Sequence, residues 1–205
     1  MKIGIFGGCF NPPHKMHKSM AEELITNNYL DKVIYVPTGN MYNKVDLIDA
    51  SHRYNMLKLM TRESANLEVS DYELKTHLKY TYQTLDHFKK LYPKDEIYFI
   101  CGSDNLKEIK TWKNYEYILE TFKLLVVKRD NDDLSNILED INHKNIEIAN
   151  VNLSNISSTM IRQMLKYQSK KSEIIQYIDK SVLEYIENLK IYSNILWVIG
   201  GILWW

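Results

Sequence analysis

Short apolar runs alternate along this chain with longer segments in which apolar positions recur every three or four residues. The short runs are typical of buried strands, and the longer segments are typical of helices that cover a sheet. Strands are therefore expected at Lys2–Phe6, Lys32–Val36, Leu67–Ser70, Glu96–Cys101, Lys123–Val127 and Asn145–Ile148. Helices are expected at Lys15–Asn28, Ser51–Arg62, Tyr80–Leu91 and Asn114–Glu120, and shorter ones at Leu134–Asn142, Ser158–Lys166, Ser172–Tyr177 and Lys180–Lys190.

This alternation predicts βα units and a mostly parallel sheet that is covered by helices on both faces. In such sheets ligands bind at the carboxyl ends of the strands. Three strand-end segments should meet at this rim, namely Gly7-Gly8, Pro37-Thr38-Gly39 and Gly102-Ser103-Asp104. The predicted fold is an α/β, Rossmann-like, doubly wound sheet with a small helical C-terminal part.

The chain is expected to form one catalytic domain over residues 1–190, because no repeat, low-complexity tract or Pro/Gly linker divides it. Residues 191–205 carry no charge and are strongly apolar. This tail is shorter than the roughly 18–20 apolar residues that span a bilayer. An interfacial anchor, a subunit contact and a segment without function remain open. The last two are favoured, because no face rich in Lys or Arg accompanies the tail.

Composition excludes a strong global field. Lys and Arg total 26, as do Asp and Glu, so the formal net charge is zero and the sequence pI is about 7.0. No nucleic-acid partner and no stable membrane span are expected. The two cysteines form no disulfide framework, which favours the reducing cytoplasm. No export signal is expected, because the first candidate site begins within the first ten residues.

The first candidate site follows the first predicted strand and reads Gly7-Gly8-Cys9-Phe10-Asn11-Pro12-Pro13-His14-Lys15-Met16-His17. Glycines allow close approach of a ligand, and the next helix offers unpaired N–H groups at the positive end of its dipole. His14 and His17 are three residues apart, so both rings share one helical face. The ordered set predicts a phosphate site, whereas its pieces taken separately could only start a helix.

A second candidate site lies at the start of a later predicted helix. Ser157, Ser158 and Thr159 are consecutive hydroxyl residues, and Arg162 follows one turn later. Such residues commonly cap a helix, but together with an arginine they can also bind a polyphosphate. Two separate anion sites suit a triphosphate, and the phosphate interpretation is therefore preferred here.

The first motif resembles the Gly-Gly-x-Phe-x-Pro-x-His-x-Gly-His signature of the nucleotidyltransferase superfamily, and Ile156–Arg162 is similar to its distal phosphate motif. Members transfer a nucleoside monophosphate from a triphosphate to a phosphate acceptor. The resemblance implies ATP binding by Gly7, Gly8, Phe10, His14, His17, Gly102, Asp104, Ser157, Ser158, Thr159 and Arg162. Met16 replaces the glycine between the histidines, which leaves its effect on ATP binding open and keeps a non-catalytic nucleotide-binding protein as an alternative.

Further segments resemble the bacterial nicotinate-nucleotide adenylyltransferase family. They are Gly102-Ser103-Asp104-Asn105-Leu106 with Thr111-Trp112, Asp71-Tyr72-Glu73-Leu74 with Tyr80-Thr81-Tyr82-Gln83-Thr84-Leu85, and Arg53-Tyr54-x-Met56. The likeness implies that Asp104 meets the adenosine ribose, that Thr81 and Tyr82 surround the pyridine carboxylate, and that Trp112 stacks on the pyridine ring. Packing for Trp112 and helix capping for Asp104 are the alternatives.

Two basic residues complete the predicted mononucleotide side. Lys44 matches a lysine of a family loop in that one residue, and Arg129 follows the end of a predicted strand. An exposed arginine in a charged turn is the alternative for Arg129.

The predicted reaction is transfer of AMP from ATP to nicotinate mononucleotide, which yields nicotinate adenine dinucleotide and pyrophosphate for NAD biosynthesis. The nucleophile is already an anion, so positioning and charge neutralisation suffice, with His14, His17 and Arg162 as catalytic residues. Mg²⁺ is expected on the phosphates without a protein ligand set. Nicotinamide mononucleotide and phosphopantetheine are alternative acceptors. The sequence leaves the preference between acid and amide open, as it does the oligomeric state, a homo-oligomer included.

Overall fold

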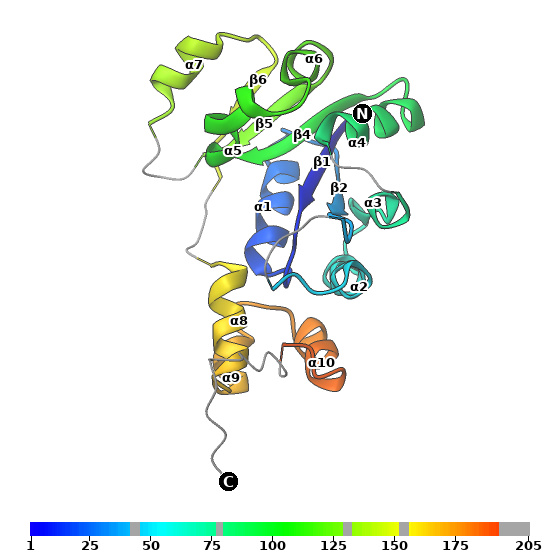
Figure 1. Cartoon of the computed structure of the whole chain (residues 1–205), viewed down its shortest axis with the longest axis vertical. Helices are drawn as coiled ribbons and strands as arrows, with labels where there is room; N and C mark the ends of the chain where they lie inside the picture. Colours follow the sequence, from blue (N-terminus) through cyan, green and yellow to red (C-terminus); the bar gives the residue numbers. More distant parts are fainter. Residues whose placement is uncertain (42–45, 77–79, 129–132, 152–155, 193–205) are drawn as a thin grey trace, which may run out of the picture.

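The computed structural model describes residues 1–41, 46–76, 80–128, 133–151 and 156–192. Its centre is a sheet of six parallel strands in the order β3-β2-β1-β4-β5-β6 (Figure 1). The strands are β1 (Lys2–Gly8), β2 (Lys32–Pro37), β3 (Leu67–Val69), β4 (Glu96–Gly102), β5 (Lys123–Val127) and β6 (Ile146–Ala149). The strand order reverses its direction between β1 and β4, which is where ligands bind in open sheets of this type.

The strands are buried on both faces because helices cover each face. In β4, Ile97, Phe99 and Cys101 belong to one apolar cluster, whereas Tyr98 and Ile100 belong to the other. This is the two-residue alternation of a strand, with apolar side chains on both sides. The nearly continuous apolar runs of the inner strands therefore match a parallel sheet with helices on both faces, whereas Glu68 of β3 and Glu147 of β6 are exposed at its two edges.

Helices from both halves of the chain surround the sheet. They are α1 (Lys15–Thr26), α2 (Ala50–Thr61), α3 (Tyr72–Lys75), α4 (Thr81–Leu91), α5 (Ser103–Glu108), the 3₁₀ helix η1 (Ile109–Thr111), α6 (Tyr115–Thr121), α7 (Ser135–Ile141), α8 (Ser158–Lys166), α9 (Lys171–Ile174) and α10 (Lys180–Asn188). Buried residues of α1, α2, α8, α9 and α10 share one cluster with the sheet, and those of α4, α5 and α6 share the other. The doubly wound prediction is confirmed.

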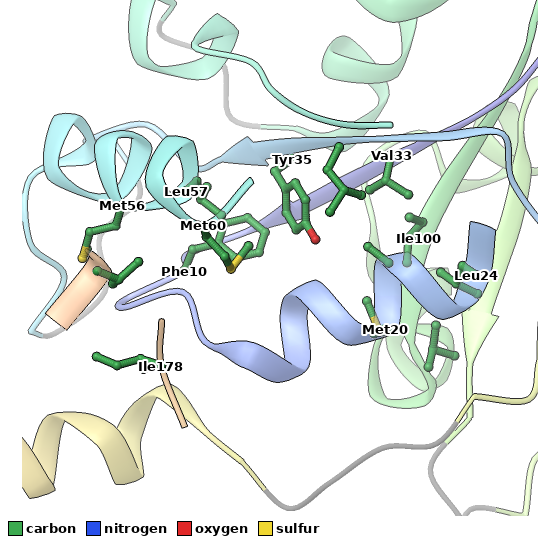
Figure 2. Close-up of a cluster of buried hydrophobic side chains, with 14 of the residues drawn as sticks. Phe10, Met20, Leu24, Val33, Tyr35, Met56, Leu57, Met60, Ile100 and Ile178 are labelled. Atoms are coloured by element: carbon green, nitrogen blue, oxygen red, sulfur yellow. The ribbon is translucent and has the colours of Figure 1, made fainter. Parts of the chain in front are cut away.

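The small C-terminal part packs beside the first βα units. Figure 1 places α8, α9 and α10 together at the end of the molecule opposite α6 and α7. Ile178, after α9, belongs to the same cluster as Phe10 from the loop after β1 and Met56 from α2 (Figure 2). The C-terminal helices therefore support the loop that carries the two histidines. None of the described helices is long and apolar enough to cross a membrane.

The observed strands match the expected ones to within two residues at each end. Two short helices, α3 and η1, were not expected, because four- and three-residue elements are too short to show a helical period. The short helix α5 was implied by the capping alternative for Asp104, but its N-cap is Gly102, and Asp104 lies in its first turn. The helix expected over 172–177 is shorter, since α9 ends at Ile174 and turns follow.

Candidate active site

The loop after β1 folds back on itself at a bulky residue. Phe10 has φ 47°, a left-handed conformation that is rare for such a side chain. Its ring is 3 % exposed and lies edge-on to His17, with 5.0 Å between ring centroids. A Cβ on Gly8 would lie 3.1 Å from the Phe10 ring, so glycine is the residue that leaves room for this fold. The Phe10 ring thus packs against the His17 ring.

The two histidines stand at the start of α1. Their rings stack with 3.6 Å between centroids and 23° between planes. The backbone N–H of His14 donates to Nδ1 of His17 at 3.1 Å. Because that nitrogen is an acceptor, the neutral ring carries its proton on Nε2. The Tyr35 hydroxyl donates to the His17 carbonyl at 2.8 Å and fixes the first turn from the sheet.

Burial keeps both rings neutral. It lowers the pKa of His14 from its usual 6.5 to about 4. Burial, followed by the charge of His14, lowers the pKa of His17 well below 6.5. A proton on Nδ1 of His14 would also lack an acceptor, since that buried atom has no hydrogen-bond partner among the described residues. At neutral pH the pair offers N–H donors rather than positive charges.

The second motif packs directly against this loop. The Ser158 hydroxyl donates to the Pro12 carbonyl at 2.8 Å, and Arg162 Nη1 donates to the Asn11 carbonyl at 2.9 Å. Arg162 Nη2 also reaches Thr159 Oγ1 at 3.4 Å. The structure therefore brings together two motifs that are more than 140 residues apart in sequence.

Ser157 has a local role at the start of α8. Its hydroxyl accepts from the backbone N–H of Met160 at 3.2 Å, so it caps the helix. In the cap the Ser157 oxygen is an acceptor, whereas a phosphate would accept the hydroxyl proton, so one hydroxyl can make both contacts. The phosphate role of Ser157 stays a prediction.

A cavity of about 510 Å³ opens on the other side of the β1 end. It is lined by Ile5, Gly7, Gly8, Cys9, Thr38, Gly39, Met41, Glu73, Tyr80, Thr81, Thr84, Leu85, Phe99, Asn105 and Trp112. The Trp112 ring lies edge-on to Phe99, with 5.6 Å between centroids. Of the residues expected on the mononucleotide side, Thr81 and Trp112 line this cavity. Tyr82 does not line it and packs against the apolar cluster beneath α4.

One carboxyl group closes the wall of this cavity. Glu73 of α3 accepts from the Thr84 hydroxyl of α4 at 2.6 Å. Burial raises the pKa of Glu73, while hydrogen bonds from Thr84 and the backbone of Gly39, and the charge of Arg53, act in the opposite direction. A Cβ on Gly39 would overlap the Glu73 carbonyl oxygen, so only glycine permits this approach. Glu73 joins three segments around the cavity.

The family of the chain follows from comparison with known proteins. The cytidylyltransferase-like family matches residues 5–164. A Clostridium tetani protein named "Probable nicotinate-nucleotide adenylyltransferase" is 36 % identical over 200 residues, which are 93 % of this chain and 98 % of that protein. A Fusobacterium nucleatum protein of the same name is 37 % identical over 193 residues, with 91 % and 97 % coverage. This chain belongs to the nicotinate-nucleotide adenylyltransferase family.

Solved structures share its fold. A nicotinic acid mononucleotide adenylyltransferase of Plasmodium falciparum, complexed with APC, superposes with a TM-score of 0.77 at 24 % identity. The match covers 93 % of this chain and 96 % of that one. This similarity supports the fold assignment.

The other predicted site residues of this nicotinate-nucleotide adenylyltransferase family member fall into two groups. Some lie at the carboxyl ends of the strands, and the others lie outside the described residues. Gly102 ends β4, and Asp104 is exposed in the first turn of α5, with Gly102 as the N-cap of that helix. Their contacts with adenosine stay predictions. Lys44 and Arg129 lie outside the described residues, as does the tail from 193 onward.

Several residues at the site had no role in the sequence-based prediction. Arg53 is fully buried and donates to the carbonyls of Cys9 at 2.9 Å, Ile48 at 3.0 Å and Thr38 at 2.5 Å. Arg53 and Glu73 stand within segments that carry the family resemblance, which was the available signal for them. Thr38 lies in a strand-end loop that was expected at this rim. Asn105 also stands within a segment that carries the resemblance, and the structure places it in the cavity lining.

Met16 is half-buried and packs against the apolar interior. Its side chain contacts the cluster that contains Phe10, Met20 and Ile161, and its sulfur lies 3.9 Å from the Ser19 hydroxyl. The side chain therefore has a packing role at the position where the superfamily signature has glycine.

The described residues contain no group of three or more His, Cys, Asp or Glu side chains that could hold a metal ion. His17 also uses its Nδ1 within the protein. A hard cation such as Mg²⁺ prefers oxygen ligands, so this donor set fits a Mg²⁺ that is held by substrate phosphates and water.

We expect the free energy of unfolding to decrease as the pH falls from 6.5 towards 4. The unfolded state binds more protons in this range, because the folded-state pKa of His14 is lowered to about 4. The loss attributable to His14 should total about 3 kcal/mol. Urea unfolding of the wild type and of His14→Gln across this range measures it. Parallel curves for the two proteins would contradict the buried, neutral His14.

We expect Met16→Gly to leave ATP affinity unchanged or weaker, because the Met16 side chain packs against the interior. Glycine in a helix also costs up to about 1 kcal/mol relative to alanine, so the melting temperature should fall. ATP titration and thermal melts test this, with Met16→Leu as the variant that keeps the packing. Tighter ATP binding by the glycine variant would show that Met16 crowds the nucleotide.

Proposed function

We propose that this chain transfers AMP from ATP to nicotinate mononucleotide, forming nicotinate adenine dinucleotide and pyrophosphate in NAD biosynthesis. Relatives named nicotinate-nucleotide adenylyltransferase and the Plasmodium falciparum enzyme complexed with NaAD support this reaction. The observation that carries it is the division of the site at the end of β1. The anion-binding motifs lie on one side of Gly7-Gly8, and a cavity with an aromatic wall lies on the other.

The reaction needs little covalent assistance from the protein. The 5′-phosphate of the mononucleotide is an anion and attacks the α-phosphorus of ATP, while pyrophosphate leaves with the bonding electrons. Positioning the two phosphates in line and stabilising the charge that moves to the leaving group therefore supply the rate. His14 and His17 stand as neutral donors at the helix start, where the backbone N–H groups add a positive potential.

Arg162 is assigned to the distal phosphates. Arg162 uses one Nη1 proton on the Asn11 carbonyl and one Nη2 proton on Thr159, which leaves other donors of its five for an anion. Ser158 and Thr159 present hydroxyls beside it. These three residues would hold the β- and γ-phosphates close to His14 and His17.

The cavity suits the pyridine end of the mononucleotide. Its volume of about 510 Å³ is within the usual range for small-molecule sites. Trp112 and Phe99 provide flat aromatic surface, and a cationic pyridinium ring gains both area and cation–π attraction from such a surface. Thr81 and Thr84 add hydroxyls to the same wall. Phosphopantetheine has no ring that would use the aromatic wall.

We propose that Mg²⁺ accompanies the ATP phosphates and supplies charge neutralisation there.

We also propose a cytoplasmic location. Both cysteines are free thiols, and burial raises the pKa of Cys101 to about 12, which keeps it protonated and unreactive.

Pyrophosphate release tests the proposed function. The purified protein is mixed with ATP and Mg²⁺ and with one of three acceptors: nicotinate mononucleotide, nicotinamide mononucleotide or phosphopantetheine. The highest kcat/KM is expected with nicotinate mononucleotide. A preference for the amide or for phosphopantetheine would assign another acceptor, and no release with any of them would favour a nucleotide-binding protein without this activity.

We expect His17→Ala to lower kcat by roughly 10²–10³-fold, as for removal of one preorganised donor, with a small change in the KM for ATP. Steady-state kinetics measure both constants. His143→Ala is the matched control, because the His143 Nδ1 also accepts a backbone N–H, from Asn145 at 3.3 Å, but lies before β6 and away from the site. Equal turnover of the two variants would remove His17 from the mechanism.

We expect Trp112→Ala to raise the KM for nicotinate mononucleotide and to leave the KM for ATP nearly unchanged. Stacking of a base on an aromatic ring is worth on the order of 1–3 kcal/mol, or about 5- to 150-fold in affinity. Trp112→Phe should retain part of the affinity. Equal weakening of both substrates, with altered circular dichroism, would indicate that Trp112 only supports packing.

A further inference from the structure

We propose that Tyr192 is a positioning residue for adenylyl transfer, because its hydroxyl holds Asn11 and thereby the loop that presents His14 and His17. The proposal goes beyond the predicted site, which ended at Arg162. The kinetic test of this proposal rests on the proposed function. The structural test rests only on the hydrogen bonds around Asn11.

Asn11 is fixed at three points by distant parts of the chain. Its Oδ1 accepts from the Tyr192 hydroxyl at 2.7 Å, and its Nδ2 donates to the Asp46 carbonyl at 2.7 Å. Its own carbonyl accepts from Arg162 at 2.9 Å. Asn11 is 5 % exposed, so each of these groups would lose a hydrogen bond without water to replace it. The side chain therefore has one favourable position.

Tyr192 is placed for this contact at a conformational cost. It has φ 66°, which is a left-handed conformation that a bulky residue rarely adopts. The ring is nevertheless 5 % exposed and belongs to the core cluster. Phe10, the residue before Asn11, also has positive φ, so an unusual backbone conformation occurs near each end of this contact.

The hydroxyl keeps the proton that it donates. Burial raises the pKa of Tyr192, and the charges of Arg162 and Arg53 act against this increase. The two arginines hold the same loop from other directions, Arg162 at the Asn11 carbonyl and Arg53 at the Cys9 carbonyl. Tyr192 completes this set because it fixes the side chain of Asn11, the residue before Pro12.

The contact matters for the reaction because the loop is short. Two prolines separate Asn11 from His14, and the Pro12 carbonyl is bonded to Ser158. A shift of Asn11 is therefore passed on to the histidine stack. Since a misplacement of about 1 Å can cost up to about 10²-fold in rate, loss of one hydroxyl far from the substrate can lower turnover.

Tyr185 provides a matched control from the same C-terminal part. Its hydroxyl contacts His52 Nδ1 at 3.0 Å and accepts from Asn55 at 3.1 Å, so it also joins the C-terminal helices to α2. It has no hydrogen bond to the histidine loop among the described contacts. Tyr185→Phe removes an equivalent hydroxyl and tests for a general loss of stability.

The experiment compares Tyr192→Phe with Tyr185→Phe in the full chain. We expect Tyr192→Phe to lower kcat roughly 10-fold and to change the KM of either substrate by less than about 2-fold. Amide hydrogen exchange of His14, whose N–H is bonded to His17, should accelerate by a similar factor. Tyr185→Phe should change neither quantity. The exchange measurement requires no activity, so it tests the contact even if the proposed reaction fails.

A double-mutant cycle with Asn11→Ala separates the contact from other effects. Each single variant removes one partner of the same hydrogen bond, so the double variant should lose no more kcat than Asn11→Ala alone. Losses that multiply would overturn the proposal. It would also be overturned if Tyr192→Phe left kcat and His14 exchange at the Tyr185→Phe values. If Tyr192→Phe does not fold, as judged by thermal melting, the His14 exchange rate in Asn11→Ala decides: an unchanged rate overturns the proposal.

Discussion

The guanidinium of Arg53 has no exposed surface, and its hydrogen bonds hold the segments that follow β1 and β2. It donates to the Cys9 carbonyl after β1, to the carbonyl and hydroxyl of Thr38 after β2, and to the Ile48 carbonyl before α2. A buried charge of this kind is tolerated only when its donors are satisfied, and loss of one partner leaves the others unpaired. The loop with the two histidines and the wall of the cavity both start from the segments that Arg53 holds together.

The electrostatics of the site are local. The chain has no net charge, and the histidine pair is kept neutral by burial. Neutral donors at a helix start can face a polyphosphate without the desolvation cost of buried cations. Arg162 supplies positive charge at the neighbouring helix start, where it already holds the loop by the Asn11 carbonyl. Arg162 therefore positions the loop in the structure, and in the proposed function it also binds the distal phosphates.

The C-terminal part completes the site from outside the sheet. Ser158 and Arg162 of α8 and Tyr192 after α10 all form hydrogen bonds with the Asn11–Pro12 segment. Buried apolar residues of α8, α9 and α10 belong to the same cluster as Phe10, the residue before Asn11. Packing of these helices and the geometry of the histidines therefore depend on each other.

The sequence alone was enough to predict the strands, the long helices and the two motifs that meet after β1, because apolar periodicity and short motifs are local properties. It also placed Thr81 and Trp112 near a common ligand through family resemblance. The tertiary structure was needed to show that Tyr82 of α4 packs against the apolar cluster, that Glu73 closes the cavity wall, and that Arg53 and Tyr192 hold the loop with the two histidines. These roles depend on contacts between residues that are far apart in the sequence. Arg53 and Cys9 are 44 positions apart, and Tyr192 and Asn11 are 181 positions apart. Such hydrogen bonds form because each polar group is buried in the folded protein and needs a partner there. The local sequence pattern does not show which partner that will be.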